Sequence, residues 1–206
     1  YKTFSILRLD FEKDRKGFKL KSSMENMNKK QMSETEICLN FITPAIEKSG
    51  WSKKQVRMNV YFTDGRIIVA GKTVKRGRRN FADYILEYKP NVPLAVIEAK
   101  DNNHSIGDGM QQGLEYAEKL DLPFVFSSNG DGFIFHDRET GKETKLTLDN
   151  FPSQKELWEK YKKYNGITEK IEDTITSDYF YEPGFKQPRY YQRIAINRTI
   201  ESVAKG

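Results

Sequence analysis

The stretch that most constrains the fold is the apolar run Leu-Ala-Val-Ile at residues 94–97, which ends in Glu98, Ala99 and Lys100. Side chains of a strand alternate between its two faces, so a run that is apolar on both faces predicts a strand that is covered on both sides. Such a strand lies in the centre of a sheet between layers of helices. Because Glu98 and Lys100 are two positions apart, they are expected to project from the same face where this strand ends.

Other apolar runs predict the strands that surround it. They cover residues 60–62, 66–70, 81–88, 123–127 and 133–135. Asp64-Gly65 has the composition of a hairpin turn, residues 71–79 are expected to form a basic link, and residues 129–132 a turn between two strands.

Helical spacing recurs on both sides of the strand region. Ser33 and Glu36 have the spacing of a capping box and predict a helix over 34–48, in which Pro44 is a kink or a break. Apolar residues at helical spacing predict a second helix over 105–120, capped by Ser105, with further helices after residue 153. This order of elements predicts an α/β fold with a central mixed β-sheet flanked by helices.

Composition narrows the cellular setting and the class of partner. The formal net charge of +6 favours an anionic partner, of which nucleic acid is the commonest, although a basic surface alone has the same composition. The single cysteine, Cys38, excludes a disulfide or a cysteine-based zinc site within the chain and is typical of a reducing compartment. No apolar run is long enough to span a bilayer, so we expect a cytoplasmic protein with no membrane partner.

A carboxylate in the preceding strand gives Glu98 and Lys100 a chemical context. Asp83 lies in that strand and is expected beside the pair. Two carboxylates at close range repel each other unless a cation lies between them, and hard oxygen ligands suit Mg²⁺ or Mn²⁺. A nearby lysine can then orient a nucleophile in phosphodiester hydrolysis. The alternative is an ordinary ion pair at a strand end, which contributes only about 0–1 kcal/mol when it is exposed.

Asp83 followed by Glu98-Ala99-Lys100 resembles the motif of the PD-(D/E)xK nuclease superfamily, with alanine in place of the proline before the aspartate. Gln112 and Tyr116 have a Gln-x-x-x-Tyr spacing similar to that of the RecB-like branch, on a flank beside the apolar stripe of their helix. Residues 33–136 resemble, in particular, the N-terminal nuclease domain of the motor (R) subunit of type I restriction enzymes.

The resemblance implies a restriction-endonuclease-like core and a metal-dependent DNA endonuclease, with Mg²⁺ or Mn²⁺ held by Asp83, Glu98 and the carbonyl of Ala99. Lys100 would orient the attacking water, and Gln112 and Tyr116 would support the site or touch DNA. The implied partners are double-stranded DNA and the specificity and methyltransferase subunits of the restriction complex. Two alternatives stay open: another RecB-like nuclease of DNA repair or mobile elements, and a nuclease-like fold that only binds DNA or partner subunits.

Two further groups of residues carry alternative interpretations. The resemblance allows Glu36 to approach the metal, whereas the capping box needs it only for the backbone. The basic residues before the Asp83 strand could hold DNA phosphates or could be a solvated loop, and they are Lys72, Lys75, Arg76, Arg78 and Arg79.

Three parts of the chain follow from these patterns. Residues 1–30 form an N-terminal extension, 31–150 the endonuclease domain, and 151–206 a helical linker and the start of the first helicase lobe. Gln192 corresponds to an adenine-recognising glutamine in the resemblance, although a plain terminal amphipathic helix also fits its segment. A phosphate-binding loop sequence is absent, so we expect ATP to bind only to the full-length protein.

Overall fold

The computed structural model of the chain describes residues 28–63, 67–70, 73–76, 78–178 and 188–206. For residues 67–70 and 73–76 the structure describes the backbone only. Most of the predicted N-terminal extension, the predicted Asp64-Gly65 turn and Lys72 therefore lie outside the described residues.

A six-stranded mixed sheet organises the protein. Its spatial order is β1 (Val56–Thr63), β4 (Arg79–Glu87), β5 (Pro93–Ala99), β6 (Phe124–Ser128), β7 (Phe133–Asp137) and β8 (Lys142–Leu146). β5 and β6 are parallel, and the other neighbours are antiparallel. The predicted central strand is β5, whose residues 94–99 are all buried. The sequence did not predict β8, because most of its residues are polar and exposed.

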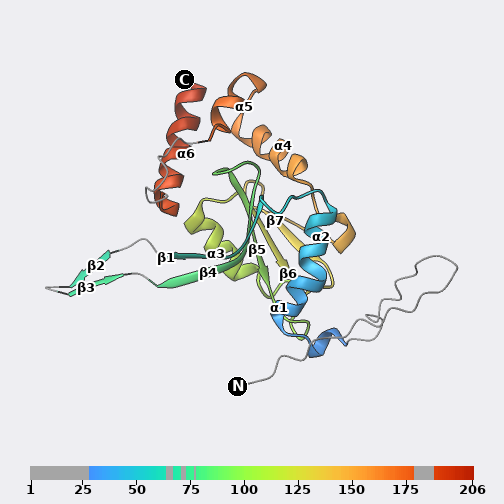
Figure 1. Cartoon of the computed structure of the whole chain (residues 1–206). Coiled ribbons are helices and arrows are strands. Elements are labelled where there is room, and N and C mark those ends of the chain that lie inside the picture. The colour runs from blue at the N-terminus through green and yellow to red at the C-terminus, as the bar shows by residue number, and fades with distance from the viewer. Residues whose placement is uncertain (1–27, 64–66, 71–72, 77, 179–187) are drawn as a thin grey trace, which may run out of the picture.

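Helices cover both faces of the sheet, as predicted (Figure 1). The N-terminal helical segment consists of α1 (Glu34–Ile37), a π-helical turn (Cys38–Ile42) and α2 (Thr43–Lys48). It packs on one face together with α4 (Gln154–Asn165). On the other face α3 (Met110–Leu120) packs against β1, β4, β5 and β6. The chain continues with α5 (Glu169–Ile175) and α6 (Tyr190–Lys205).

The structure explains how the first helix accommodates Pro44. Proline has no amide hydrogen to donate, and its ring crowds the carbonyl group four residues earlier in an α-helix. Here a π-helical turn precedes it, in which the Thr43 amide donates to the Cys38 carbonyl. The wider turn allows the helical segment to continue, so Pro44 changes the local winding without breaking the segment.

The predicted start of the second helix is wrong by about one turn. Ser105 does not cap α3, because its amide and hydroxyl groups both bond to the Asp108 carboxylate within a separate turn. The N-cap of α3 is Gly109, which has no side chain to interpose between the helix and the sheet. A methyl group there would lie 2.9 Å from Ser127 Oγ and 3.2 Å from the carbonyl oxygen of Glu98. Close packing therefore fixes where this helix begins.

The predicted basic link over 71–79 is also partly wrong. Residues Thr73–Arg76 form β3, which pairs antiparallel with β2 (Ile67–Ala70). Because β1 pairs with β4 as well, the two short strands make a ribbon in line with a longer hairpin, and this ribbon projects from the body of the protein (Figure 1).

The segment after residue 150 packs onto the sheet from its start. Leu157 and Trp158 of α4 are fully buried in the same core as α1 and α2. The predicted domain boundary near residue 150 stays a prediction. In the described part of the chain, no helix combines the length and apolar character needed to cross a membrane.

Candidate active site

The site begins where β4 and β5 stop pairing. Their last paired residues at this end are Tyr84 and Ile97. At the next position Asp83 Oδ2 accepts a hydrogen bond of 2.8 Å from the Ala99 amide, so a side-chain carboxylate takes the place of a backbone acceptor. β5 continues in register with β6 as far as Ala99. The two strands thus separate on the Asp83 side of β5, and Asp83 is fixed at that point.

Glu98 lies under α3 at the same level of the sheet. Its side chain is covered by Gly109 and Gly113, at which added methyl groups would lie 3.1 Å from Glu98 Cβ and 3.5 Å from Glu98 Cγ. Only 1% of Glu98 is exposed, and neither carboxylate oxygen has a hydrogen-bond partner among the described residues. An uncompensated buried carboxylate is costly, so this position requires a proton or a cation.

The electrostatics of the pair follow from burial and proximity. Burial, and then the charge of Asp83, raise the pKa of Glu98 to about 9, while Lys100 lowers it. Burial also raises the pKa of Asp83, whereas the hydrogen bond from Ala99 and the charge of Lys100 lower it. The structure therefore brings Asp83, Glu98 and Lys100 together, as the strand pattern predicted.

Lys100 is positioned from α3. Its ammonium group donates to Gln112 Oε1 at 3.2 Å, and Gln112 Nε2 donates to the Tyr116 hydroxyl at 3.1 Å. The sequence placed Gln112 and Tyr116 on a flank beside the apolar stripe, but Tyr116 is only 8% exposed and its ring belongs to the core under α3. Gln112 is half-buried and bridges this core and the lysine.

Of the two acidic residues in the first turn of α1, Glu34 lies nearer to the site. Glu36 accepts hydrogen bonds from the Ser33 amide at 2.8 Å and the Ser33 hydroxyl at 2.9 Å, and these bonds lower its pKa. Burial, and then Asp83, raise the pKa of Glu34, while Lys100 lowers it. Sequence reasoning considered Glu36 and missed Glu34. The capping box was the available signal, since it occupies Glu36 and leaves its neighbour free to face the sheet.

The predicted DNA- and nucleotide-binding residues are described only in part. Arg78 and Arg79 are exposed at the start of β4, and the side chains of Lys75 and Arg76 in β3 lie outside the description. Gln192 accepts a hydrogen bond of 2.9 Å from the Arg189 amide and so belongs to the capping box of α6. The DNA and nucleotide roles of these residues stay predictions.

Among the described residues, two carboxylates, those of Asp83 and Glu98, meet at the strand separation. Within the described ranges, no cluster of three or more His, Cys, Asp and Glu side chains has an arrangement that could hold a metal. Two carboxylates nevertheless suit Mg²⁺, which is commonly bound by one or two protein carboxylates and keeps several waters. The orphaned oxygens of Glu98 fit such an ion, because it would supply the charge compensation that the protein lacks there.

Comparisons with known proteins identify the family of this chain. The family model "Type I restriction enzyme R protein N terminus (HSDR_N)" matches residues 40–152. The endonuclease subunit of the type I restriction enzyme EcoAI from Escherichia coli is 47% identical over 188 residues, which cover 89% of this chain and 23% of that subunit.

A solved structure is similar as well. A fragment assigned as an HsdR subunit of a type I restriction enzyme from Vibrio vulnificus YJ016 has 40% identity and a TM-score of 0.73. The match covers 85% of this chain and 33% of that one. The chain thus spans about a quarter of the curated relative and a third of the solved chain. On the family match and these similarities, the chain belongs to the family of type I restriction enzyme R protein N-terminal regions.

Proposed function

We propose that this chain is the metal-dependent DNA endonuclease module of a type I restriction R subunit, and that it hydrolyses phosphodiester bonds in double-stranded DNA. The observation that carries the proposal is the buried Glu98 carboxylate, which faces Asp83 and has no hydrogen-bond partner among the described residues. A site of this kind binds a divalent cation more readily than it serves as a structural ion pair.

Asp83, Glu98 and the Ala99 carbonyl are the proposed ligands of Mg²⁺ or Mn²⁺. When bound, such an ion polarises a phosphoryl oxygen and lowers the pKa of a coordinated water. Lys100 orients the attacking water and offsets the negative charge that develops on the phosphate. Gln112 limits the motion of Lys100 by accepting a hydrogen bond from its ammonium group. The Ala99 amide donates a hydrogen bond to Asp83, so the positions of the Asp83 carboxylate and of the Ala99 backbone are fixed relative to each other.

Glu34 is a proposed additional acidic group of the site. The charges of Asp83 and Lys100 both act on its pKa, which places it within electrostatic range of the two. Because Mg²⁺ is usually bound with several waters, Glu34 can act by accepting a hydrogen bond from a coordinated water.

Double-stranded DNA and the specificity and methyltransferase subunits are the proposed partners, and ATP is proposed for the full-length protein only. The basic residues around the β2–β3 ribbon would contact phosphates, because such contacts need positive charge and no base recognition. Gln192 would contribute to nucleotide recognition in the full-length protein.

The decisive experiment compares plasmid cleavage by the assembled complex with wild-type chain, Lys100→Ala and Lys142→Ala. Lys142 is exposed on β8, so Lys142→Ala removes the same charge at a position away from the site. We expect Lys100→Ala to lower cleavage by at least about a hundredfold, as typical losses of an electrostatic catalytic group do. Lys142→Ala should cleave as wild type does.

A catalytically inactive nuclease-like fold is the alternative from another functional class. It predicts equal cleavage by the wild-type and Lys100→Ala complexes, with DNA or subunit binding retained in both. That result would overturn the endonuclease proposal. Inactivity of the 206-residue chain alone would not, because cleavage can depend on the other parts of the complex.

A further inference from the structure

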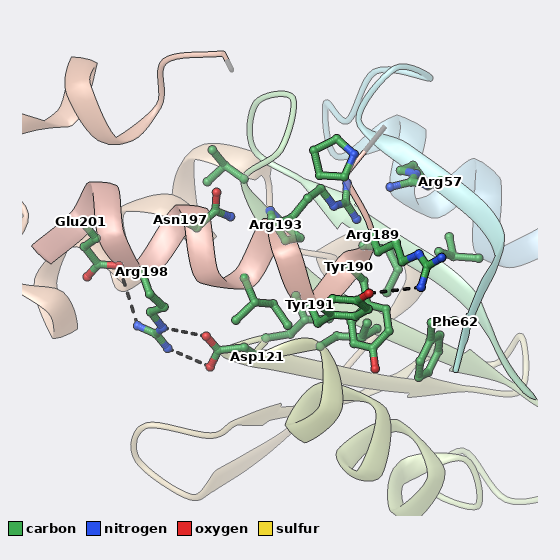
Figure 2. Close-up of a pocket in the computed structure, with 18 of the residues that line it drawn as sticks. Arg57, Phe62, Asp121, Arg189, Tyr190, Tyr191, Arg193, Asn197, Arg198 and Glu201 are labelled. Atoms are coloured by element: carbon green, nitrogen blue, oxygen red, sulfur yellow. Dashed lines mark hydrogen bonds and ion pairs between the residues drawn. The ribbon is translucent and has the colours of Figure 1, made fainter. Parts of the chain in front are cut away.

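A continuous series of side-chain contacts connects α6 with Lys100. It begins at Tyr190 in the first turn of α6, whose hydroxyl donates to the Thr63 carbonyl of β1 at 2.5 Å. The Tyr190 ring packs edge-on against Phe62, with ring centroids 5.9 Å apart. Figure 2 shows the two aromatic side chains beside each other, one from the helix and one from the sheet.

The series continues through the core under α3. Phe62 packs edge-on against Tyr116, with centroids 5.0 Å apart and an interplanar angle of 90°. The two side chains are only 2% and 8% exposed, so they move little without displacing their neighbours. The Tyr116 hydroxyl then accepts the hydrogen bond from Gln112 Nε2, and Gln112 Oε1 accepts from Lys100.

The orientation of the Gln112 amide is the sensitive step. A lysine ammonium group only donates hydrogen bonds, so the oxygen end of the amide must face Lys100 and the nitrogen end must face elsewhere. The ammonium group sets that orientation, and the Tyr116 hydroxyl holds the amide in place by accepting from its nitrogen. If the Tyr116 hydroxyl moved away, the amide would lose this restraint, and its oxygen could move out of reach of the ammonium group. The Lys100 ammonium group would then lose the one hydrogen bond that it makes to a described residue.

Several side-chain contacts attach α6 to the rest of the fold, among them the bond from Asn197 to the Asn91 carbonyl at 2.8 Å and the bond from Tyr161 to Glu201 at 3.0 Å. Arg198 makes a bidentate ion pair with Asp121, the C-cap residue of α3, at 2.6 and 2.8 Å. Arg193 lies 3.4 Å from the buried carboxylate of Glu87 in β4. Between these anchors and the sheet lies a cavity of about 690 Å³, part of whose lining Figure 2 shows. Since α6 is not packed continuously against the sheet, Tyr190 is the anchor through which it reaches Phe62.

We propose that Tyr190 and Phe62 are positioning residues of the nuclease site, which hold Tyr116 so that Gln112 presents its oxygen to Lys100. This inference rests on the proposed function of Lys100. By this proposal, the position of the Lys100 ammonium group depends on α6, which lies outside the sheet that carries Asp83 and Glu98. Small displacements of a catalytic group have large effects on rate, since misplacement by about 1 Å can cost about a hundredfold.

Cleavage kinetics of the assembled complex test the proposal. We expect Tyr190→Ala to lower kcat by about tenfold or more with an unchanged KM for DNA, because Lys100 acts on the chemical step. Tyr190→Phe keeps the ring against Phe62 and should retain most activity. Tyr191→Ala is the matched control. Tyr191 is 43% exposed and packs on the outer side of the series, edge-on against the Tyr190 ring at 5.5 Å, so the variant leaves the contact of Tyr190 with Phe62 in place and should cleave as wild type does.

Combination with Gln112→Ala separates positioning from general destabilisation. If Tyr190 acts through Gln112, Tyr190→Ala should cause no further loss of kcat in the Gln112→Ala background. Losses that multiply in the double variant would overturn the proposal. So would an equal loss of kcat in Tyr191→Ala, since that would indicate a general effect of disturbing α6.

The Gln112 side-chain amide gives a readout that does not depend on cleavage. In the ¹⁵N-labelled 206-residue chain, its resonances should shift in Tyr190→Ala and Phe62→Leu but stay in place in Tyr191→Ala. Unshifted resonances in Tyr190→Ala would overturn the proposed series of contacts. If the resonances shift while Lys100→Ala cleaves as wild type does, the contact series stands and the endonuclease proposal fails.

Discussion

At the scale of single residues, the burial of Glu98 has a clear effect on the free energy of unfolding. Its pKa is raised from 4.5 to about 9, first by burial and then by Asp83. Between these two values the native state binds more protons than the unfolded state does. The free energy of unfolding of the metal-free chain therefore falls as pH rises through this window. Glu98 therefore lowers the stability of the metal-free chain in this window, which is the behaviour expected of a proposed metal ligand.

Glu98→Gln tests this expectation. The substitution removes the ionisable group at nearly constant volume, so we expect the metal-free chain to gain at least about 2 kcal/mol of stability at pH 8. The decrease in stability between pH 5 and 8 should also become smaller. Urea unfolding at several pH values in the presence of a chelator measures both effects. An unchanged pH dependence would contradict the assigned pKa of Glu98. Cleavage by the assembled complex should be lost.

A second prediction at this scale separates the two acidic residues of the α1 first turn. Glu34→Gln should weaken Mg²⁺ binding severalfold, because Glu34 shares the electrostatic field of Asp83 and Lys100. Glu36→Gln should leave Mg²⁺ binding unchanged, since its carboxylate serves the capping box. Calorimetric titration with Mg²⁺ measures both affinities. Equal weakening in the two variants would remove the distinction between them.

At the scale of elements, the close approach of α3 to the sheet determines how Glu98 is buried. A methyl group on Gly113 would lie 2.7 Å from Val125 Cγ1, a contact that side chains do not make without a shift of the helix or the strand. We expect Gly113→Ala to destabilise the chain by about 1–3 kcal/mol, as overpacked core positions do. Thermal unfolding of the metal-free chain measures this loss.

Gly107→Ala is a suitable control for that substitution. A methyl group there would meet only Ile134 Cγ1, at an ordinary contact distance of 3.9 Å. The control should change stability by less than about 0.5 kcal/mol. If both variants are equally stable, α3 does not approach the sheet as closely as the structure has it.

The helices and strands differ in how well the sequence predicts them. The strand over residues 93–99 and the shared face of Glu98 and Lys100 follow from alternation, which is a local property. The start of α3, the pairing of β2 with β3 and the burial of Tyr116 depend on contacts between segments distant in the chain. Local patterns carry little information about such contacts, and these are the points at which the predictions differ from the structure.

At the scale of the whole molecule, metal binding should be visible as stability. A ligand that binds only the native state stabilises it by about 2.7 kcal/mol at a hundred times its dissociation constant. For a chain of this size, Mg²⁺ should therefore raise the melting temperature by about 5 °C or more at pH 8. Asp83→Asn should lose most of this increase, and a chelator should reverse it in the wild type. An equal increase in the variant would point to a metal site elsewhere.

The family and the general architecture could be predicted because the motif residues lie on recognisable strands and a helix. Glu34 could not be selected over Glu36 from the sequence, since both lie in the first turn of the same helix and only the fold shows which one comes within electrostatic range of Asp83. The link between α6 and Lys100 was equally hidden. Its members come from β1, α3 and α6, and the contacts between them exist only after folding.

The hydrogen bond from the Ala99 amide to Asp83 also affects how variants of this protein should be interpreted. In Asp83→Ala, the Ala99 amide would lose its acceptor at the point where the two strands separate. The loss of activity in that variant would mix a lost ligand with an altered sheet. Asp83→Asn retains a carbonyl oxygen that can accept the bond, so the comparison of the two variants separates the aspartate's role in ending the strand pairing from its role in chemistry.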